Sequence, residues 1–148
     1  MIGAGSLFNV SLRFVIRQNP QHQIAREAVR KLKERGDEIY TFPQSCIEFW
    51  NVLTRPSKNN GFGYSVGDTD FFLRLIERIF PLMRDDARIY REWRKLVVDF
   101  GVSGVQVHDA RIVAAMLVHQ VTHILTFNTS DFARYSRLGI VAIDPKNL

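Results

Sequence analysis

The chain has 148 residues, of which 46% are hydrophobic, 24% are charged and 11% are aromatic. This length suits one domain and this composition excludes a disordered chain, so we expect a single domain over residues 1–148. One cysteine, Cys46, excludes an internal disulfide framework and indicates a reducing, cytoplasmic compartment. The longest apolar run, residues 112–118, is far shorter than the roughly 20 residues of a membrane-spanning helix, so we expect no membrane span.

The positive charge of the chain comes mainly from arginine. The net charge is +5, and 15 of the 20 cationic side chains are arginine. The planar guanidinium group matches the geometry of a phosphate, so this composition indicates a polyanionic partner. Solvated basic faces on a protein that binds no nucleic acid explain the charge equally well.

Proline and glycine divide the chain into short elements. Pro20 favours the first turn of a helix, Gly36 ends a helix, and Pro81 breaks one. In chain order, the pattern predicts a strand over residues 2–8, helices over 9–17 and 21–35, a strand over 38–42, helices over 43–53, 69–80, 87–100 and 107–119, a strand over 123–127, a short helical turn over 131–135 and a strand over 140–143. Strands that alternate with helices indicate βαβ units, so we expect an α/β fold with a mainly parallel sheet.

Three acidic residues lie close to the ends of predicted strands. Glu48 lies in the helix after the second strand, Asp109 opens a helix, and Asp131 follows the third strand. Ligands of parallel α/β sheets bind at the carboxyl ends of the strands, so we expect these carboxylates to converge. Converging carboxylates repel one another unless a divalent cation such as Mg²⁺ or Mn²⁺ neutralises them, and such ions promote phosphodiester hydrolysis. Taken singly, Asp109 and Asp131 are typical helix caps, and Glu48 is typical of a solvent-facing position.

The histidines are weaker candidates. His119 and His123 have the four-residue spacing of a zinc pair on one helix. The helix is expected to end near residue 120, so the two side chains should point apart, and we expect no zinc site. His108 precedes Asp109 and is either an exposed turn residue or a group that contacts phosphate.

Three stretches of the sequence resemble a known family. They are FPQSCIEFWNVLTRP, VSGVQVHDARIVAAM and HILTFNTSDFARY. Their order and content resemble the PIN domain and, within it, the VapC-like toxins. The resemblance implies a three-layer α/β/α fold and a Mg²⁺- or Mn²⁺-dependent endoribonuclease. It also implies RNA as substrate, a cognate antitoxin that blocks the site, and a homodimer.

The resemblance also assigns roles to individual residues. Glu48 matches the second acidic position of the family, and Asp109 matches the third. The fourth falls at Asn128 or Asp131, because members differ in which of these two places holds the acid. Thr126 matches the hydroxyl residue beside it. The resemblance therefore implies that Glu48, Asp109 and Asp131 are catalytic and bind the metal, with Thr126 and Asn128 in support.

The opening motif departs from the family. Typical members read Asp-Thr-Asn-Val at this point, whereas this chain reads Leu7-Phe8-Asn9-Val10. Asn9 matches the asparagine of the family motif, which supports the acidic residues. Leu7 stands at the position of the first acidic residue of the family. Leucine cannot ligate a metal, and its presence removes one negative charge from the cluster, so metal affinity should fall. The sequence therefore supports two hypotheses: an active ribonuclease, or a catalytically degenerate PIN domain that binds an antitoxin or RNA.

Overall fold

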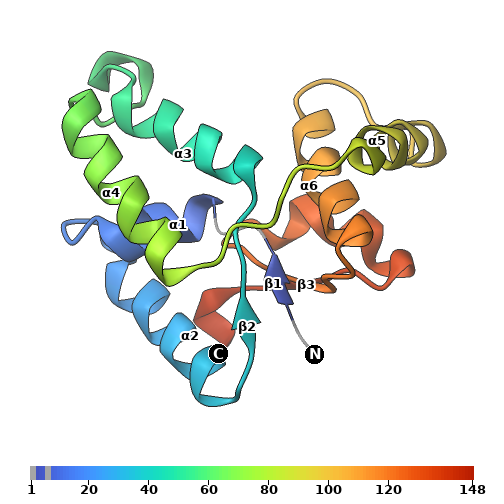
Figure 1. The fold of residues 1–148 in the computed structure, drawn as a ribbon, viewed down its shortest axis with the longest axis horizontal. Helices are drawn as coiled ribbons and strands as arrows, with labels where there is room; N and C mark the ends of the chain where they lie inside the picture. The colour runs from blue at the N-terminus through green and yellow to red at the C-terminus, as the bar shows by residue number, and fades with distance from the viewer. Residues whose placement is uncertain (1–2, 6–7) are drawn as a thin grey trace.

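A parallel four-stranded sheet forms the centre of the molecule (Figure 1). The computed structural model describes residues 3–5 and 8–148, with side chains from Val10 onward. The strands are β1 (Gly3–Gly5), β2 (Glu38–Ile39), β3 (His123–Leu125) and β4 (Val141–Ile143). Their order in the sheet is β2-β1-β3-β4, and every pairing is parallel. The parallel sheet predicted from the alternation of elements is confirmed.

Helices connect the strands and cover the sheet. They are α1 (Phe8–Val15), α2 (His22–Glu34), α3 (Pro43–Thr54), α4 (Val66–Ile79), α5 (Ala87–Asp99) and α6 (Gln106–Val118), with 3₁₀ segments η1 (Ser57–Asn59), η2 (Thr129–Leu138) and η3 (Pro145–Asn147). Among the residues that the structure describes, no helix has the length and apolarity to cross a membrane.

Two hydrophobic cores lie on opposite faces of the sheet. Successive side chains of a strand point to opposite faces, and β3 follows this rule with two buried residues. Leu125 packs into a core built from α1, α2, α3 and α4, whereas Ile124 packs into a core built from α5, α6 and η2. Figure 1 shows these two helix groups on either side of the strands. The three-layer α/β/α architecture is therefore confirmed.

The second strand is shorter than the pattern predicts. The predicted strand spans residues 38–42, but β2 ends at Ile39. Beyond it the backbone changes partner, because Thr41 N donates to Pro81 O (3.0 Å) and Met83 N donates to Thr41 O (2.8 Å). The apolar pattern therefore indicated extended backbone correctly, but the partner segment comes from the loop after α4 and not from β1.

Local capping explains where two helical segments begin and end. The helix predicted over residues 69–80 begins at Val66, because Ser65 Oγ accepts a hydrogen bond from Asp68 N (3.1 Å). The predicted turn over residues 131–135 is part of the longer 3₁₀ segment η2. That segment ends at Leu138, and Gly139 follows it with a φ of 83°, which glycine favours.

The loop after α3 requires glycine at position 61. A Cβ atom there would lie 2.0 Å from the carbonyl oxygen of Arg55, a backbone atom that cannot move aside alone. We expect Gly61→Ala to lower the free energy of unfolding by about 2 kcal/mol in urea titrations. Gly67→Ala is the control, because its Cβ would lie 4.0 Å from the nearest atom and alanine favours the helix α4. Equal urea midpoints for the two variants would contradict this account of the loop.

Candidate functional site

Asp109 lies in the first turn of α6 and is half-buried. Burial, then the charge of Asp131, and then the charge of Glu48 raise the pKa of Asp109 to about 6. The charge of His108 acts in the opposite direction. Burial alone accounts for the largest part of this shift, and only the two charge contributions require Asp131 and Glu48 to lie within electrostatic range of Asp109. The fold therefore places acidic groups from α3 and η2 within electrostatic range of Asp109 in α6, although the three residues are separated in the sequence.

Glu48 lies in α3, where it is half-buried. Burial raises the pKa of Glu48, whereas a hydrogen bond from Gln44 and the charge of His108 lower it. The hydrogen bond runs from Gln44 Nε2 to Glu48 Oε1 over 3.1 Å. His108 therefore lies close enough to influence both Glu48 and Asp109, and its own side chain is exposed.

Asp131 is positioned by the turn that follows β3. Thr126 is buried, and its Oγ1 accepts a hydrogen bond from Asn128 N (3.0 Å). Asn128 O then accepts from Asp131 N (3.1 Å), which starts the first turn of η2. Asn128 and Asp131 both have exposed side chains. The fourth acidic position was expected at Asn128 or Asp131. Asp131 carries the charge that acts on Asp109, whereas Asn128 contributes the backbone hydrogen bond of the turn.

Three residues of the opening motif, Leu7, Phe8 and Asn9, have no described side chain. Leu7 lies outside the described residues, and Asn9 lies in α1 with its backbone alone described. Their predicted roles therefore stay predictions. The sequence establishes that residue 7 brings no carboxylate to the site.

The donor chemistry of the acidic cluster fits Mg²⁺ or Mn²⁺. Carboxylate oxygens are the ligands that these ions prefer. The pKa of Asp109 is raised first by burial and then by the charges of Asp131 and Glu48, and a cation would relieve the second cause. Within residues 10–148, no three His, Cys, Asp or Glu side chains are grouped closely enough to hold one ion directly. Mg²⁺ needs no such cage, because it keeps several waters and binds through one or two carboxylates.

The two histidines with zinc-like spacing are engaged elsewhere. The helix α6 ends at Val118, close to the predicted end. His119 Nε2 lies 2.7 Å from Arg84 O, and His123 Nδ1 lies 2.7 Å from Thr122 Oγ1. Each ring therefore has a local hydrogen-bond partner.

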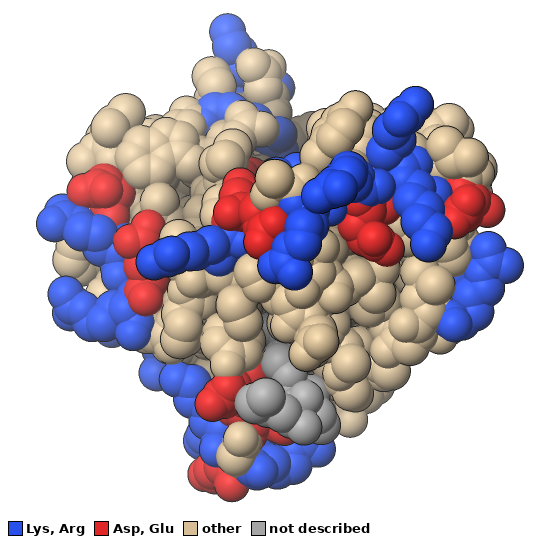
Figure 2. All heavy atoms as spheres, turned by 45° about the vertical axis from the view of Figure 1, so that its right-hand side comes forward, with Lys and Arg blue, Asp and Glu red and all other residues tan. Residues whose placement is uncertain are grey.

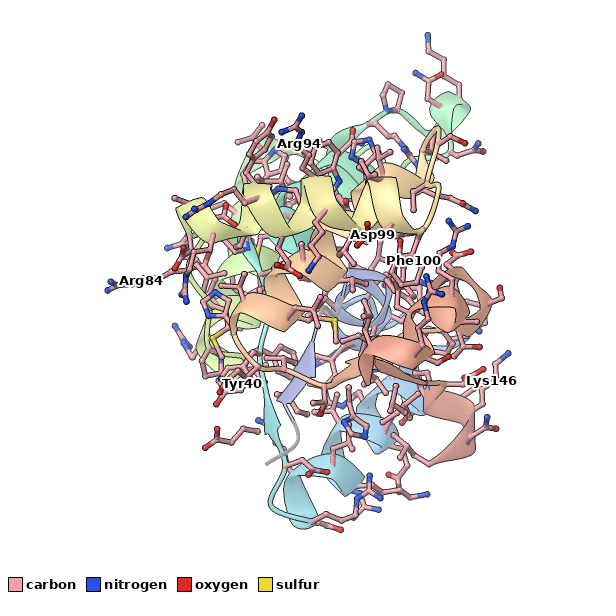
Figure 3. The ribbon with its side chains drawn as sticks, turned by 90° about the vertical axis from the view of Figure 1, so that its right-hand side faces the viewer. Tyr40, Arg84, Arg94, Asp99, Phe100 and Lys146 are labelled. Carbon is pink, nitrogen blue, oxygen red and sulfur yellow. The ribbon has the colours of Figure 1, made fainter. Side chains whose placement is uncertain are left out.

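Exposed arginine side chains lie on the elements that contact α6. Figure 2 shows Lys and Arg interspersed with smaller groups of Asp and Glu over one face. In Figure 3, Arg84 extends outward from the segment before α5, and Arg94 extends outward from α5 itself. The helix α5 packs against α6, which carries Asp109. Exposed arginines therefore lie on α5, which packs against α6, and on the segment before α5, which contacts the end of α6 opposite Asp109.

The sequence did not reveal the hydrogen-bonding role of Gln44. Its four-residue separation from Glu48 is a helix-neighbour spacing and was a usable signal. The second contact, from Arg111 Nη1 to Gln44 Oε1 (3.1 Å), joins residues of different helices. Local sequence carries no signal for that contact.

Comparison with known proteins identifies the family. The model of the PIN domain family matches residues 9–138, which is most of the chain. The chain belongs to the PIN domain family. Glu48, Asp109 and Asp131 all lie inside the matched part of this PIN domain. A search of the curated proteins gives no match.

Solved structures of toxin–antitoxin complexes share the fold of this PIN domain. VapBC2 from Rickettsia felis, bound to a promoter DNA fragment, has a TM-score of 0.69 at 12% identity, covering 97% of this chain and 98% of that chain. VapBC-1 from nontypeable Haemophilus influenzae has a TM-score of 0.66 at 14% identity, with 98% of each chain covered. FitAcB from Neisseria gonorrhoeae has a TM-score of 0.66 at 17% identity, with 100% of each chain covered. The PIN fold of this chain is therefore the fold that these complexes also contain.

Proposed function

We propose that this PIN domain, a single domain over residues 1–148, is a Mg²⁺- or Mn²⁺-dependent endoribonuclease of the toxin–antitoxin type. Glu48, Asp109 and Asp131 are the proposed metal-binding and catalytic residues. Asn9, Thr126 and Asn128 support them. The observation that carries the proposal is the electrostatic coupling of Asp109 to Asp131 and Glu48 in a half-buried position.

The residues of the chain have separate tasks in this mechanism. When bound, the cation supplies activation of water and stabilisation of the leaving oxygen of the phosphodiester. Asp109 holds a proton part of the time near neutral pH and releases it when the local negative charge is neutralised. The turn built on Thr126 and Asn128 holds the backbone of Asp131, whose charge acts on Asp109. Exposed arginines such as Arg94 bind the RNA backbone by contacts with its phosphates.

The partners follow from the same proposal. We propose a cytoplasmic protein whose activity a cognate antitoxin blocks and which forms a homodimer. The solved structures with a similar fold are toxin–antitoxin complexes, and this supports the antitoxin. An apolar groove between α1, α2 and α4, with a volume of about 500 Å³ and lined in part by Phe14, Phe71 and Leu75, offers a surface for a protein partner.

A second candidate is a PIN domain that binds RNA or an antitoxin without turnover. Leu7 favours it, because the site lacks the carboxylate that the family places first. Both candidates use the same scaffold and the same basic surface. They differ in whether the three remaining carboxylates suffice for hydrolysis.

Cleavage of a single-stranded RNA tests the proposal. The wild-type protein is expected to cleave with Mg²⁺, to stop in EDTA, and to lose at least about 100-fold in rate on Glu48→Gln, since one metal-binding carboxylate is lost. Glu34→Gln is the control, because Glu34 is an exposed acid of α2 paired with Arg30. Cleavage that persists in EDTA, or in Glu48→Gln, would contradict the proposal. Metal binding without cleavage by the wild-type protein would favour the second candidate.

A further inference from the structure

The side-chain amide of Gln44 bridges the helices that carry Glu48 and Asp109. Gln44 lies in the first turn of α3, and its Nε2 donates to Glu48 Oε1 (3.1 Å). The same Nε2 donates to the backbone oxygen of His108 (2.7 Å), in the first turn of α6. His108 is the neighbour of Asp109 in the chain, so one amide group contacts one acidic residue and the turn that presents the other.

A third hydrogen bond fixes the orientation of this amide. Arg111 Nη1 donates to Gln44 Oε1 (3.1 Å), and Arg111 Nη2 lies 3.4 Å from Asp85 Oδ1. A guanidinium group only donates, whereas a carboxylate and a carbonyl only accept. The amide therefore has one orientation that satisfies all three neighbours, and turning it over would lose every one of these bonds. Asp85 in turn pairs with the other terminal nitrogen of Arg111.

We propose that Gln44 is a positioning residue that sets the separation of α3 from α6 and thereby holds the carboxylates of Glu48 and Asp109 at one cation site. Arg111 and Asp85 lock Gln44 in place. This inference rests on the proposed function, because it assigns the cation to these two carboxylates. The amide of Gln44 donates its hydrogen bond to Glu48 Oε1, so the other carboxylate oxygen of Glu48 is the one assigned to the cation.

The chemistry of Gln44 suits this task better than a charged residue would. A lysine at position 44 would pair with Glu48 and neutralise the charge that the cation needs, whereas an amide orients the carboxylate and leaves its charge intact. Groups that orient metal ligands are worth about 10-fold to 100-fold in metal affinity. The position of Gln44 on a helix, and not on a loop, makes its geometry precise.

Calorimetric titration with Mn²⁺ tests the inference. Gln44→Leu keeps the size of the side chain but removes the amide, and we expect it to weaken Mn²⁺ binding about 10-fold. Arg111→Leu should weaken it less, and Arg111→Lys, which keeps a donor, should restore part of the loss. Gln106→Leu is the matched control, because Gln106 accepts a hydrogen bond from Arg134 and forms no described bond to α3. Each titration is also run in the Leu7→Asp background.

A second readout needs no metal and covers the case in which Gln44→Leu fails to fold. The side-chain amide protons of Gln44 should exchange slowly with solvent in the wild-type protein and faster in Arg111→Leu, as followed by NMR. Arg74→Leu, which breaks an arginine–aspartate pair with Asp70 on α4, should not change them.

The possible outcomes separate the inference from the proposed function. Weaker Mn²⁺ binding in Gln44→Leu but not in Gln106→Leu supports the positioning role. Equal binding by wild-type and Gln44→Leu proteins, or rapid exchange of the Gln44 amide in the wild-type protein, overturns the positioning role and leaves the proposed function standing. Absence of Mn²⁺ binding in both the wild-type and Leu7→Asp backgrounds overturns the proposed function, and the positioning role falls with it.

Discussion

Asp109→Asn is expected to abolish Mg²⁺-dependent RNA cleavage and, at neutral pH, to stabilise the fold. The pKa of Asp109 is about 6 in the folded protein, above its ordinary value of about 4 in an unfolded chain. Below pH 4 both states are protonated, so this carboxyl group costs no stability. As the pH rises from about 4 to about 6, the unfolded chain has given up its proton while the folded state still binds it, so stability falls and stays lower above pH 6. Asparagine avoids this penalty and also removes a negative charge that the cation needs.

Urea unfolding at pH 4 and pH 7.5 measures the stability effect. Asp109 is partly exposed, so solvent screening reduces the gain to about 1 kcal/mol at pH 7.5, with no gain at pH 4. Asp70→Asn is the control, since Asp70 is paired with Arg74 on the surface of α4 and should bring no such pH-dependent gain. A variant that is less stable than the wild-type protein at pH 7.5 would show that Asp109 has a stabilising partner that this account omits.

Leu7→Asp is expected to increase Mg²⁺ affinity and RNA cleavage by at least about 10-fold. The change returns a carboxylate to the place where similar PIN domains carry their first acid, and added carboxylates strengthen the binding of a divalent cation. Without metal the same carboxylate adds repulsion to Glu48, Asp109 and Asp131. The variant should therefore be less stable than the wild-type protein in EDTA and recover on addition of Mg²⁺.

Leu7→Asn separates charge from polarity at this position. It removes the apolar side chain without adding a negative charge, so it should lower stability without raising metal affinity. Cleavage that appears only in Leu7→Asp favours the degenerate binding module, whereas cleavage by the wild-type protein that increases in Leu7→Asp favours the active nuclease. Unchanged metal affinity in Leu7→Asp would mean that residue 7 does not face the acidic cluster.

The periodicity of the sequence predicted most of the fold because the relevant signals are local. The buried strand HIL and the helix HDARIVAAM carry apolar residues at the spacings that a two-faced sheet and its covering helix require. The end of β2 was predicted wrongly for a non-local reason. Thr41 pairs with the segment around Leu82, and residues 41 and 82 show no common pattern in the sequence.

In the candidate site, too, some residues could be predicted from local sequence and others depend on non-local contacts. Glu48, Asp109 and Asp131 were proposed from their places near strand ends and from the PIN resemblance, and the fold places Asp131 and Glu48 within electrostatic range of Asp109. Their role as metal ligands stays a prediction. The bridge from Gln44 to His108 and Arg111 depends on how α3 and α6 pack, so it emerges only from the three-dimensional structure.

Calorimetric titration of Mn²⁺ at pH 6, in two buffers with different heats of ionisation, tests the central claim most directly. If a divalent cation binds among the carboxylates of Glu48, Asp109 and Asp131, binding must displace the proton that Asp109 holds part of the time. With a pKa of about 6, the wild-type protein is expected to release about half a proton per bound ion, and Asp109→Asn should release almost none. Binding without proton release and with equal affinity in both proteins, or no binding at all, would contradict the account.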